Sequence, residues 1–213
     1  MRTRTLLAAL AVTCAAGLSA ANFPDPPKEV SAPAGKAAIV LAGGCFWGME
    51  GVFEHVKGVK AVTSGYAGGS AADATYDQVS NETTRHAEAI RIVYNPADVS
   101  YGTLLRVYFS VAHNPTELNR QGPDVGTQYR SAIFYTDDQQ KKLAESSKAA
   151  VIKTKNFGST IATEITAATT FYPAEDYHQN YYLKNPIRYK FYRFNCGRDA
   201  RLRASTPGST CRR

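Results

Sequence analysis

A cysteine set between two glycines and two aromatic residues is the first feature of this sequence suited to chemistry. Cys45 follows the glycine pair and precedes Phe46 and Trp47, the only tryptophan of the 213-residue chain. The apolar run 37–42 predicts a buried strand before Cys45, and apolar residues at helical spacing predict a helix after it. We expect the helix N-terminus to favour the thiolate and the glycines to leave the sulfur accessible, which makes Cys45 a candidate nucleophile.

Each of these residues also has a purely structural interpretation. Cys45 alone is compatible with a buried, inert cysteine at the start of a core helix. Phe46 and Trp47 either line an apolar slot beside the nucleophile or belong to the core. Inside the expected helix, Gly48 and Gly51 each cost about 1 kcal/mol relative to alanine, which predicts that another segment approaches closely there.

Glu88 is the most informative acidic residue. Residues 87–94 predict a strand, on which Glu88 shares a face with Ile90 and Ile92. Burial on an apolar face raises the pKa of a carboxyl group, and a neutral carboxylic acid can donate a proton or a hydrogen bond. The alternative is a glutamate at the end of a strand that turns into solvent.

Three further polar side chains lie in stretches with few apolar residues. Tyr76 belongs to a polar stretch that ends near Arg85, and Asp124 and Tyr129 belong to the segment 113–129. A loop of that length in a compact domain is often functional, and a phenol is a rigid hydrogen-bond donor. Taken singly, each of the three fits an ordinary loop better than a site.

The N-terminal 21 residues predict a secretory signal peptide. Arg2 and Arg4 precede an apolar run over 6–16 that is too short to span a membrane, and small residues at 19–21 fit a cleavage site. We therefore expect export across the inner membrane, to the periplasm or the extracellular space. No later stretch is apolar enough for a membrane span, so we expect none in the mature chain.

The cysteine count of the exported chain is odd. Cys45, Cys196 and Cys211 remain after cleavage, so at most two of them are paired at any moment. The odd count favours redox chemistry, in which the pairing of one thiol changes during a reaction cycle. A structural disulfide between Cys196 and Cys211 is the alternative.

Composition indicates an ordinary globular domain, with 44% hydrophobic and 20% charged residues. Much of the net charge of +7 lies in C-terminal arginines, which we interpret as a solvated basic tail and not as a nucleic-acid surface. The expected strands and helices alternate irregularly, which favours an α/β sandwich with a mixed sheet. The expected strands are 37–42, 59–66, 87–94, 130–135 and 161–168, and the expected helices are 45–58, 100–112, 137–155 and 174–183.

Six motifs then give the chain a family resemblance. They are GGCFWGME at 43–50, SGYAGG at 64–69, TY at 75–76, HAEA at 86–89, GTQYRS at 126–131 and AEDYHQ at 174–179. Over roughly residues 37–190, the sequence resembles the A-type peptide-methionine sulfoxide reductases. The resemblance implies a two-layer α/β (α+β) sandwich with a mixed sheet, a split βαβ (ferredoxin-like) core, long loops and an irregular C-terminal tail. We divide the chain into the signal peptide 1–21, a linker 22–36, the reductase domain 37–193 and the tail 194–213 with its recycling cysteines.

The resemblance also implies roles for matching residues, in reduction of the S epimer of methionine sulfoxide, free and in proteins. Cys45 resembles the nucleophile that attacks the sulfoxide sulfur. Glu88 resembles the acid that helps protonate the sulfoxide oxygen. Tyr76 and Tyr129 resemble the hydroxyl partners of that oxygen, and Asp124 resembles a supporting acid.

The pocket and the recycling residues follow from the same resemblance. Phe46 and Trp47 resemble the pocket for the S-methyl group. Attack leaves a sulfenic acid on Cys45, which Cys196, in a sequence context that looks flexible, is our choice to resolve. Cys211 is the rival or takes a second exchange step. We expect a thioredoxin-like reductant, no cofactor, no metal, no nucleic-acid partner and a monomer.

Two departures from the family pattern and two other functions remain open. Arg85 stands where a glycine is usual and Ser80 where a cysteine is common, and neither position touches a proposed role. A cysteine hydrolase would need a histidine base beside Cys45. A non-catalytic, disulfide-stabilised binding module is disfavoured by the odd cysteine count.

Overall fold

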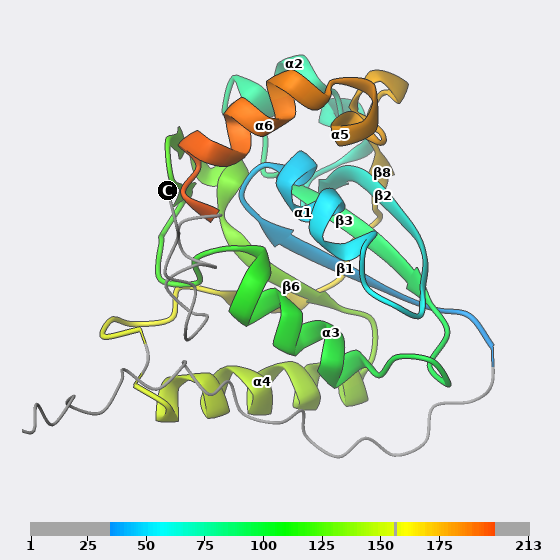
Figure 1. Cartoon of the computed structure of the whole chain (residues 1–213), viewed down its shortest axis with the longest axis vertical. Coiled ribbons are helices and arrows are strands. Elements are labelled where there is room, and N and C mark those ends of the chain that lie inside the picture. The colour runs from blue at the N-terminus through cyan, green and yellow to red at the C-terminus, as the bar shows by residue number, and fades with distance from the viewer. Residues whose placement is uncertain (1–34, 156, 199–213) are drawn as a thin grey trace, which may run out of the picture.

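A six-stranded mixed sheet forms the centre of the computed structural model, which describes residues 35–155 and 157–198 (Figure 1). The strand order is β7-β6-β1-β3-β2-β8. The strands are β1 (Ala37–Gly43), β2 (Val59–Ala67), β3 (Ala87–Tyr94), β6 (Ser131–Tyr135), β7 (Glu164–Ala167) and β8 (Tyr172–Pro173). A separate hairpin pairs β4 (Arg120–Gln121) with β5 (Asp124–Val125).

The topology contains the split βαβ arrangement that the resemblance implied. Strand β3 lies between β1 and β2 and is antiparallel to both, so β1 and β2 are parallel with a strand inserted between them. Strand β1 lies in the same way between β3 and β6, and β7 joins β6 in parallel. The expected α/β sandwich with a mixed sheet is therefore confirmed.

Helices cover one face of this sheet (Figure 1). The helical elements are α1 (Phe46–Phe53), η1 (Ala71–Asp73), α2 (Tyr76–Ser80), α3 (Tyr101–Val107), η2 (Tyr108–Ala112), η3 (Thr127–Tyr129), α4 (Asp138–Lys153), η4 (Asp176–His178), α5 (Tyr181–Lys184) and α6 (Pro186–Asn195). Ile39 and Leu41 of β1 and Ile90 and Ile92 of β3 are buried in the main core with residues of α1, α3 and α4. Because side chains alternate along a strand, the intervening small residues of β1 and β3 form a second cluster on the opposite face.

Three helices differ from their predicted extents. The helix at Cys45 ends at Phe53, and Gly58, with a φ of 97°, turns the chain into β2. The helix that begins at Tyr101 widens into a π-helical turn at η2, which buries Phe109 and Ala112. Residues 174–183 form η4 and α5 instead of one helix, because Asn180 between them is left-handed, with a φ of 53°.

The C-terminal region is more ordered than we expected from sequence. Helix α6 runs through the anticipated boundary between domain and tail at 193/194, and it crosses the end of the molecule near α1 (Figure 1). The predicted signal peptide, nearly all of the linker, and Cys211 lie outside the described residues. Within the described ranges, no helix is both long and apolar enough to cross a membrane.

The N-cap of α4 gives a stability prediction. Asp137→Ala should lower the free energy of unfolding by about 1 kcal/mol, because Oδ1 of Asp137 accepts the backbone N–H of Gln140 at 2.8 Å and alanine cannot. Urea denaturation measures the change. Asp137→Asn is the control, since its amide oxygen retains the cap, and an equal loss in both variants would contradict the capping role.

Candidate active site

Cys45 is the N-cap residue of α1, directly after β1 ends. Gly44 allows the sharp entry into the helix, because its φ of 79° is strained for any residue with a side chain. The predicted strand–turn–helix context of the cysteine is therefore present. It places Cys45 just beyond the end of β1, which pairs with β3 in the sheet.

Glu88 lies at the start of β3 and points at this turn. Its side chain shares the buried face with Ile90 and Ile92, as the alternation predicted, and is only 2% exposed. One carboxyl oxygen accepts the backbone N–H of Phe46 at 3.0 Å, and the Cys45 thiol also hydrogen-bonds to the carboxyl group. Burial raises the pKa of Glu88 to about 8, so the group is mostly a neutral acid at pH 7.

The ionisation of Cys45 differs from the prediction. Burial raises the pKa of the thiol well above its usual value, and Glu88 and Asp124, once ionised, raise it further. The positive charge of Arg198 and the backbone N–H of Trp47 oppose this shift but do not outweigh it. The helix N-terminus is present, yet desolvation dominates, so the resting pair is a thiol beside a carboxylic acid.

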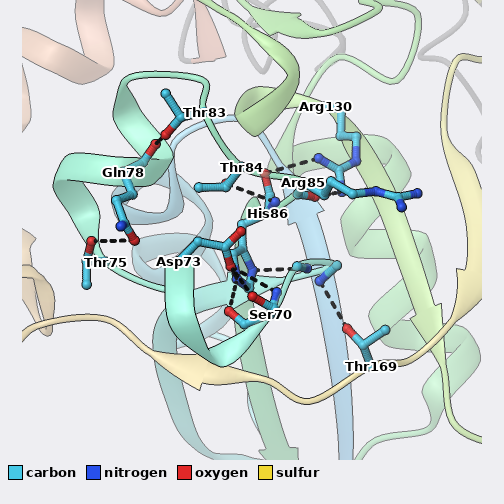
Figure 2. Close-up of polar contacts among 12 residues, drawn as sticks. Ser70, Asp73, Thr75, Gln78, Thr83, Thr84, Arg85, His86, Arg130 and Thr169 are labelled. Atoms are coloured by element: carbon cyan, nitrogen blue, oxygen red, sulfur yellow. Dashed lines mark hydrogen bonds and ion pairs between the residues drawn. The ribbon is translucent and has the colours of Figure 1, made fainter.

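A polar network fixes the start of β3 immediately before Glu88 (Figure 2). The ring of His86 accepts the backbone N–H of Gly69 at 3.2 Å and contacts the carbonyl oxygen of Ser70 at 2.9 Å. Arg130 donates to the carbonyl oxygens of Arg85 and His86 at 3.0 and 3.2 Å. His86 is thus a structural residue at the start of β3, and Arg85 contributes through its backbone carbonyl oxygen.

Aromatic side chains form one wall beside Cys45. The rings of Phe46 and Trp47 have centroids 6.3 Å apart, and Tyr181 stacks on Trp47 at 3.6 Å. The indole N–H of Trp47 donates to Nδ1 of His178 at 3.0 Å, and the His178 ring lies 4.4 Å from that of Tyr76. His178 therefore orients this wall. We had not selected it, although it lies in the AEDYHQ motif.

The two predicted tyrosines and Asp124 lie near Glu88 and Cys45. Burial raises the pKa of Tyr76 to about 12 and raises that of Tyr129 as well, with additional effects from the charges of Glu88 and Cys45. Burial also raises the pKa of Asp124. The charges of Glu88, Cys45 and Asp124 each raise the pKa values of Tyr76 and Tyr129, so the five side chains lie near one another although they come from four separate segments of the chain.

The C-terminal segment covers the site, which we did not foresee. The hydroxyl of Tyr192 donates to Asp124 at 3.0 Å, and its ring meets Trp47 edge-on at 6.1 Å. Arg198 donates to the carbonyl oxygen of Gly43 at 2.8 Å. As a result, Cys45 is only 6% exposed, and the expectation of an accessible sulfur is wrong for this state.

Two sequence interpretations of the tail are corrected by the same contacts. Arg198 is 2% exposed, so it is a buried residue of the site and not part of a solvated basic tail. Cys196 is 3% exposed and caps α6, so its context is packed and not flexible. Cys45 and Cys196 are both free thiols, whereas the structure describes nothing of Cys211.

The glycines of α1 are explained by close contacts from this segment. A Cβ atom on Gly48 would lie 2.6 Å from Nη1 of Arg198, and one on Gly51 would lie 2.3 Å from the hydroxyl oxygen of Tyr189. The predicted close approach is therefore confirmed at both positions. Sequence showed that something packs there, but not which segment.

The chemistry of the site is that of a thiol and a carboxylic acid in a largely apolar enclosure. The polar partner of Cys45 is the carboxyl group of Glu88, where a cysteine hydrolase would have an imidazole base. In the described part of the chain, no three His, Cys, Asp or Glu side chains are grouped to hold a metal ion. The arrangement suits attack by sulfur on a group that must be protonated as it reacts.

Comparison with known proteins points to one family. The family model described as peptide methionine sulfoxide reductase matches residues 37–209. The peptide methionine sulfoxide reductase MsrA 2 of Mesorhizobium japonicum is 54% identical over 158 residues, covering 74% of this chain and 80% of that protein. MsrA 2 of Synechocystis sp. is 50% identical over 168 residues, covering 77% and 78%.

Solved structures agree with the sequence relatives. Mxr1 of Saccharomyces cerevisiae in its reduced form superposes with a TM-score of 0.68 at 36% identity, covering 74% of this chain and 90% of that one. Methionine sulfoxide reductase A of Corynebacterium diphtheriae gives a TM-score of 0.65 at 33% identity, covering 81% and 87%. The chain therefore belongs to the peptide methionine sulfoxide reductase family, in its A type, and is a thiol-dependent oxidoreductase.

Proposed function

We propose that this enzyme reduces the S epimer of methionine sulfoxide, free and in proteins, with Cys45 as nucleophile and Glu88 as acid. The observation that carries the proposal is the contact between the Cys45 thiol and a buried carboxyl group whose pKa is raised to about 8. A sulfoxide oxygen is a poor leaving group until it is protonated. A neutral acid beside a sulfur nucleophile meets that requirement.

The surrounding residues support an oriented substrate. In the proposed complex, the S-methyl group packs against Phe46 and Trp47, and the sulfoxide oxygen faces Glu88 and the hydroxyls of Tyr76 and Tyr129. Asp124 supports this polar side. Because the methyl group and the oxygen would contact opposite walls, one apolar and one polar, the two epimers of the sulfoxide would fit the site differently. This agrees with the general observation that each epimer of methionine sulfoxide is reduced by its own enzyme. Tyr192 contacts both Trp47 and Asp124, so substrate entry requires Tyr192 to move aside.

The first step transfers oxygen from one sulfur to another. Cys45 forms a bond to the sulfoxide sulfur while Glu88 protonates the oxygen. The thiol proton of Cys45 then passes to Glu88 and replaces the proton that Glu88 gave up. The oxygen and its proton pass to Cys45, which becomes a sulfenic acid as methionine leaves. The methionine sulfur gains two electrons, and the Cys45 sulfur loses two.

Regeneration completes the proposed cycle. Cys196 condenses with the Cys45 sulfenic acid to give a disulfide, with Cys211 as the alternative, and a thioredoxin-like reductant then reduces the disulfide. External thiols supply the electrons, so the proposal needs no prosthetic group. We further propose that residues 1–21 direct export to the periplasm or beyond, where a membrane-relayed donor would replace cytosolic thioredoxin and the enzyme acts as a monomer.

Loss of the nucleophile should abolish activity. Cys45→Ser is expected to reduce no S-epimer methionine sulfoxide with dithiothreitol as electron donor, because serine oxygen is a far weaker nucleophile than sulfur. Chromatography of the methionine formed measures this, with Cys196→Ser as a control that retains dithiothreitol-driven activity. Activity in Cys45→Ser, or equal reduction of the R epimer by the parent protein, would contradict the assignment.

The acid role predicts a pH dependence. Protonated Glu88 is the active form, so the rate of methionine formation in a single turnover should fall as the pH rises through about 8. Glu88→Gln should lose this decline and react roughly 10² to 10⁴ times more slowly. Glu88→Ala should be slower still, because an amide can donate a hydrogen bond and a methyl group cannot. Equal rates in the two variants would argue against an acid at this position.

An assay of the recycling step distinguishes the roles of Cys196 and Cys211. Cys196→Ser should complete a single round of methionine formation and then stop when a thioredoxin system is the reductant, because its sulfenic acid is not converted to a disulfide. Cys211→Ser should continue to turn over. Methionine formed per enzyme measures both variants, and the opposite pattern would move the resolving role to Cys211.

A further inference from the structure

Arg198 is a buried cation anchored on the nucleophile's side of the site. Its Nη2 donates to the carbonyl oxygen of Gly43 at 2.8 Å, two residues before Cys45. Its Nε donates to the carbonyl oxygen of Ala112 at 2.8 Å, at the end of the π-helical turn η2. Burying a charged guanidinium costs free energy unless its N–H groups are hydrogen-bonded. The two hydrogen bonds to backbone carbonyl oxygens offset part of that cost and fix the position of the Arg198 side chain.

The remaining nitrogen of the guanidinium holds the C-terminal segment. Nη1 donates to the hydroxyl of Tyr192 at 2.7 Å and to Sγ of Cys196 at 3.4 Å. The Cys196 thiol donates in turn to the carbonyl oxygen of Arg193 at 3.4 Å. The sulfur of Cys196 is thus held from two sides, by its own helix end and by a side chain bonded to the backbone that leads into Cys45.

The surrounding backbone leaves room for this arrangement. The absence of a side chain at Gly48 accommodates the guanidinium, as described above. Gly122 has a φ of 61°, and a Cβ atom there would lie 2.8 Å from the carbonyl oxygen of Cys196. Two glycines far apart in sequence therefore make space for Arg198 and for Cys196.

We propose that Arg198 is a positioning residue for the resolution step, holding Cys196 ready to attack the sulfenic acid of Cys45. This inference rests on the proposed function. In the step, an S–S bond forms between Cys196 and Cys45 while the S–O bond of the sulfenic acid breaks. The Cys196 sulfur is oxidised, the Cys45 sulfur is reduced, and the thiol proton leaves with the hydroxide as water.

The physical basis is effective concentration. A thiol held beside its target reacts as if it were present at very high concentration, and small displacements of a reacting group reduce that advantage strongly. Without Arg198, the Cys196 sulfur loses its link to the backbone near Cys45. The sulfenic acid should then persist longer before it is resolved.

A trapping experiment on the full chain tests this. The protein receives a single equivalent of S-epimer methionine sulfoxide without reductant, and dimedone is added to capture sulfenic acid. Mass spectrometry then measures the Cys45–Cys196 disulfide and the dimedone adduct of Cys45, each divided by the methionine formed. We expect Arg198→Met to form the disulfide at least about ten times more slowly than the parent, with adduct in its place.

Two further variants separate positioning from folding. Arg188→Met removes a positive charge from an exposed position on α6 and should match the parent protein. Arg198→Lys retains the charge but has one ammonium group where the guanidinium has three donating nitrogens, so it should show an intermediate rate. General loss of folding lowers methionine and disulfide together, whereas mispositioning of Cys196 changes their ratio.

The outcomes distinguish this inference from the function on which it rests. No methionine from the parent protein would refute the proposed function itself. Methionine formation with an unchanged ratio of disulfide to adduct in both Arg198 variants would overturn the positioning role and leave the reductase function intact.

Discussion

The site depends on one hydrogen bond, from the backbone N–H of Phe46 to the buried carboxyl group of Glu88. It joins the first turn of α1 to the start of β3 and holds the Glu88 carboxyl group against the turn that carries Cys45. Burial here raises the pKa values of both Glu88 and Cys45 and so favours the protonated forms of the carboxyl group and the thiol. The split βαβ topology is what brings the two elements together, since it places β3 directly beside β1.

The second organising feature is closure by the C-terminal segment. Tyr192 occupies the space between Trp47 and Asp124, and Arg198 bonds to the backbone beside Cys45. The reduced site is therefore covered by the same segment that carries Cys196. In the proposed cycle, substrate entry requires Tyr192 of this segment to move aside, whereas Arg198 of the same segment holds Cys196 for the resolution step.

Local patterns in the sequence were enough to predict the centre of the site around Cys45 and Glu88. They were not enough to predict the C-terminal segment that covers it. Strand alternation placed Glu88 on the buried face, and the glycines of α1 revealed a close contact. The ionisation of Cys45 was mispredicted, because desolvation depends on what covers the sulfur and not on the helix N-terminus alone. Arg198 looked like part of a basic tail, because nothing in its neighbours signals the distant carbonyl groups of Gly43 and Ala112 that bind it.

The protonation state of Glu88 is the most direct test of the account. Carbon-13 NMR of the Glu88 carboxyl group, assigned by comparison with Glu88→Gln, would follow its titration in the reduced enzyme. The account predicts a neutral carboxyl at pH 7 that ionises near pH 8. A carboxylate that is already ionised at pH 5, as for a solvent-exposed glutamate, would contradict it.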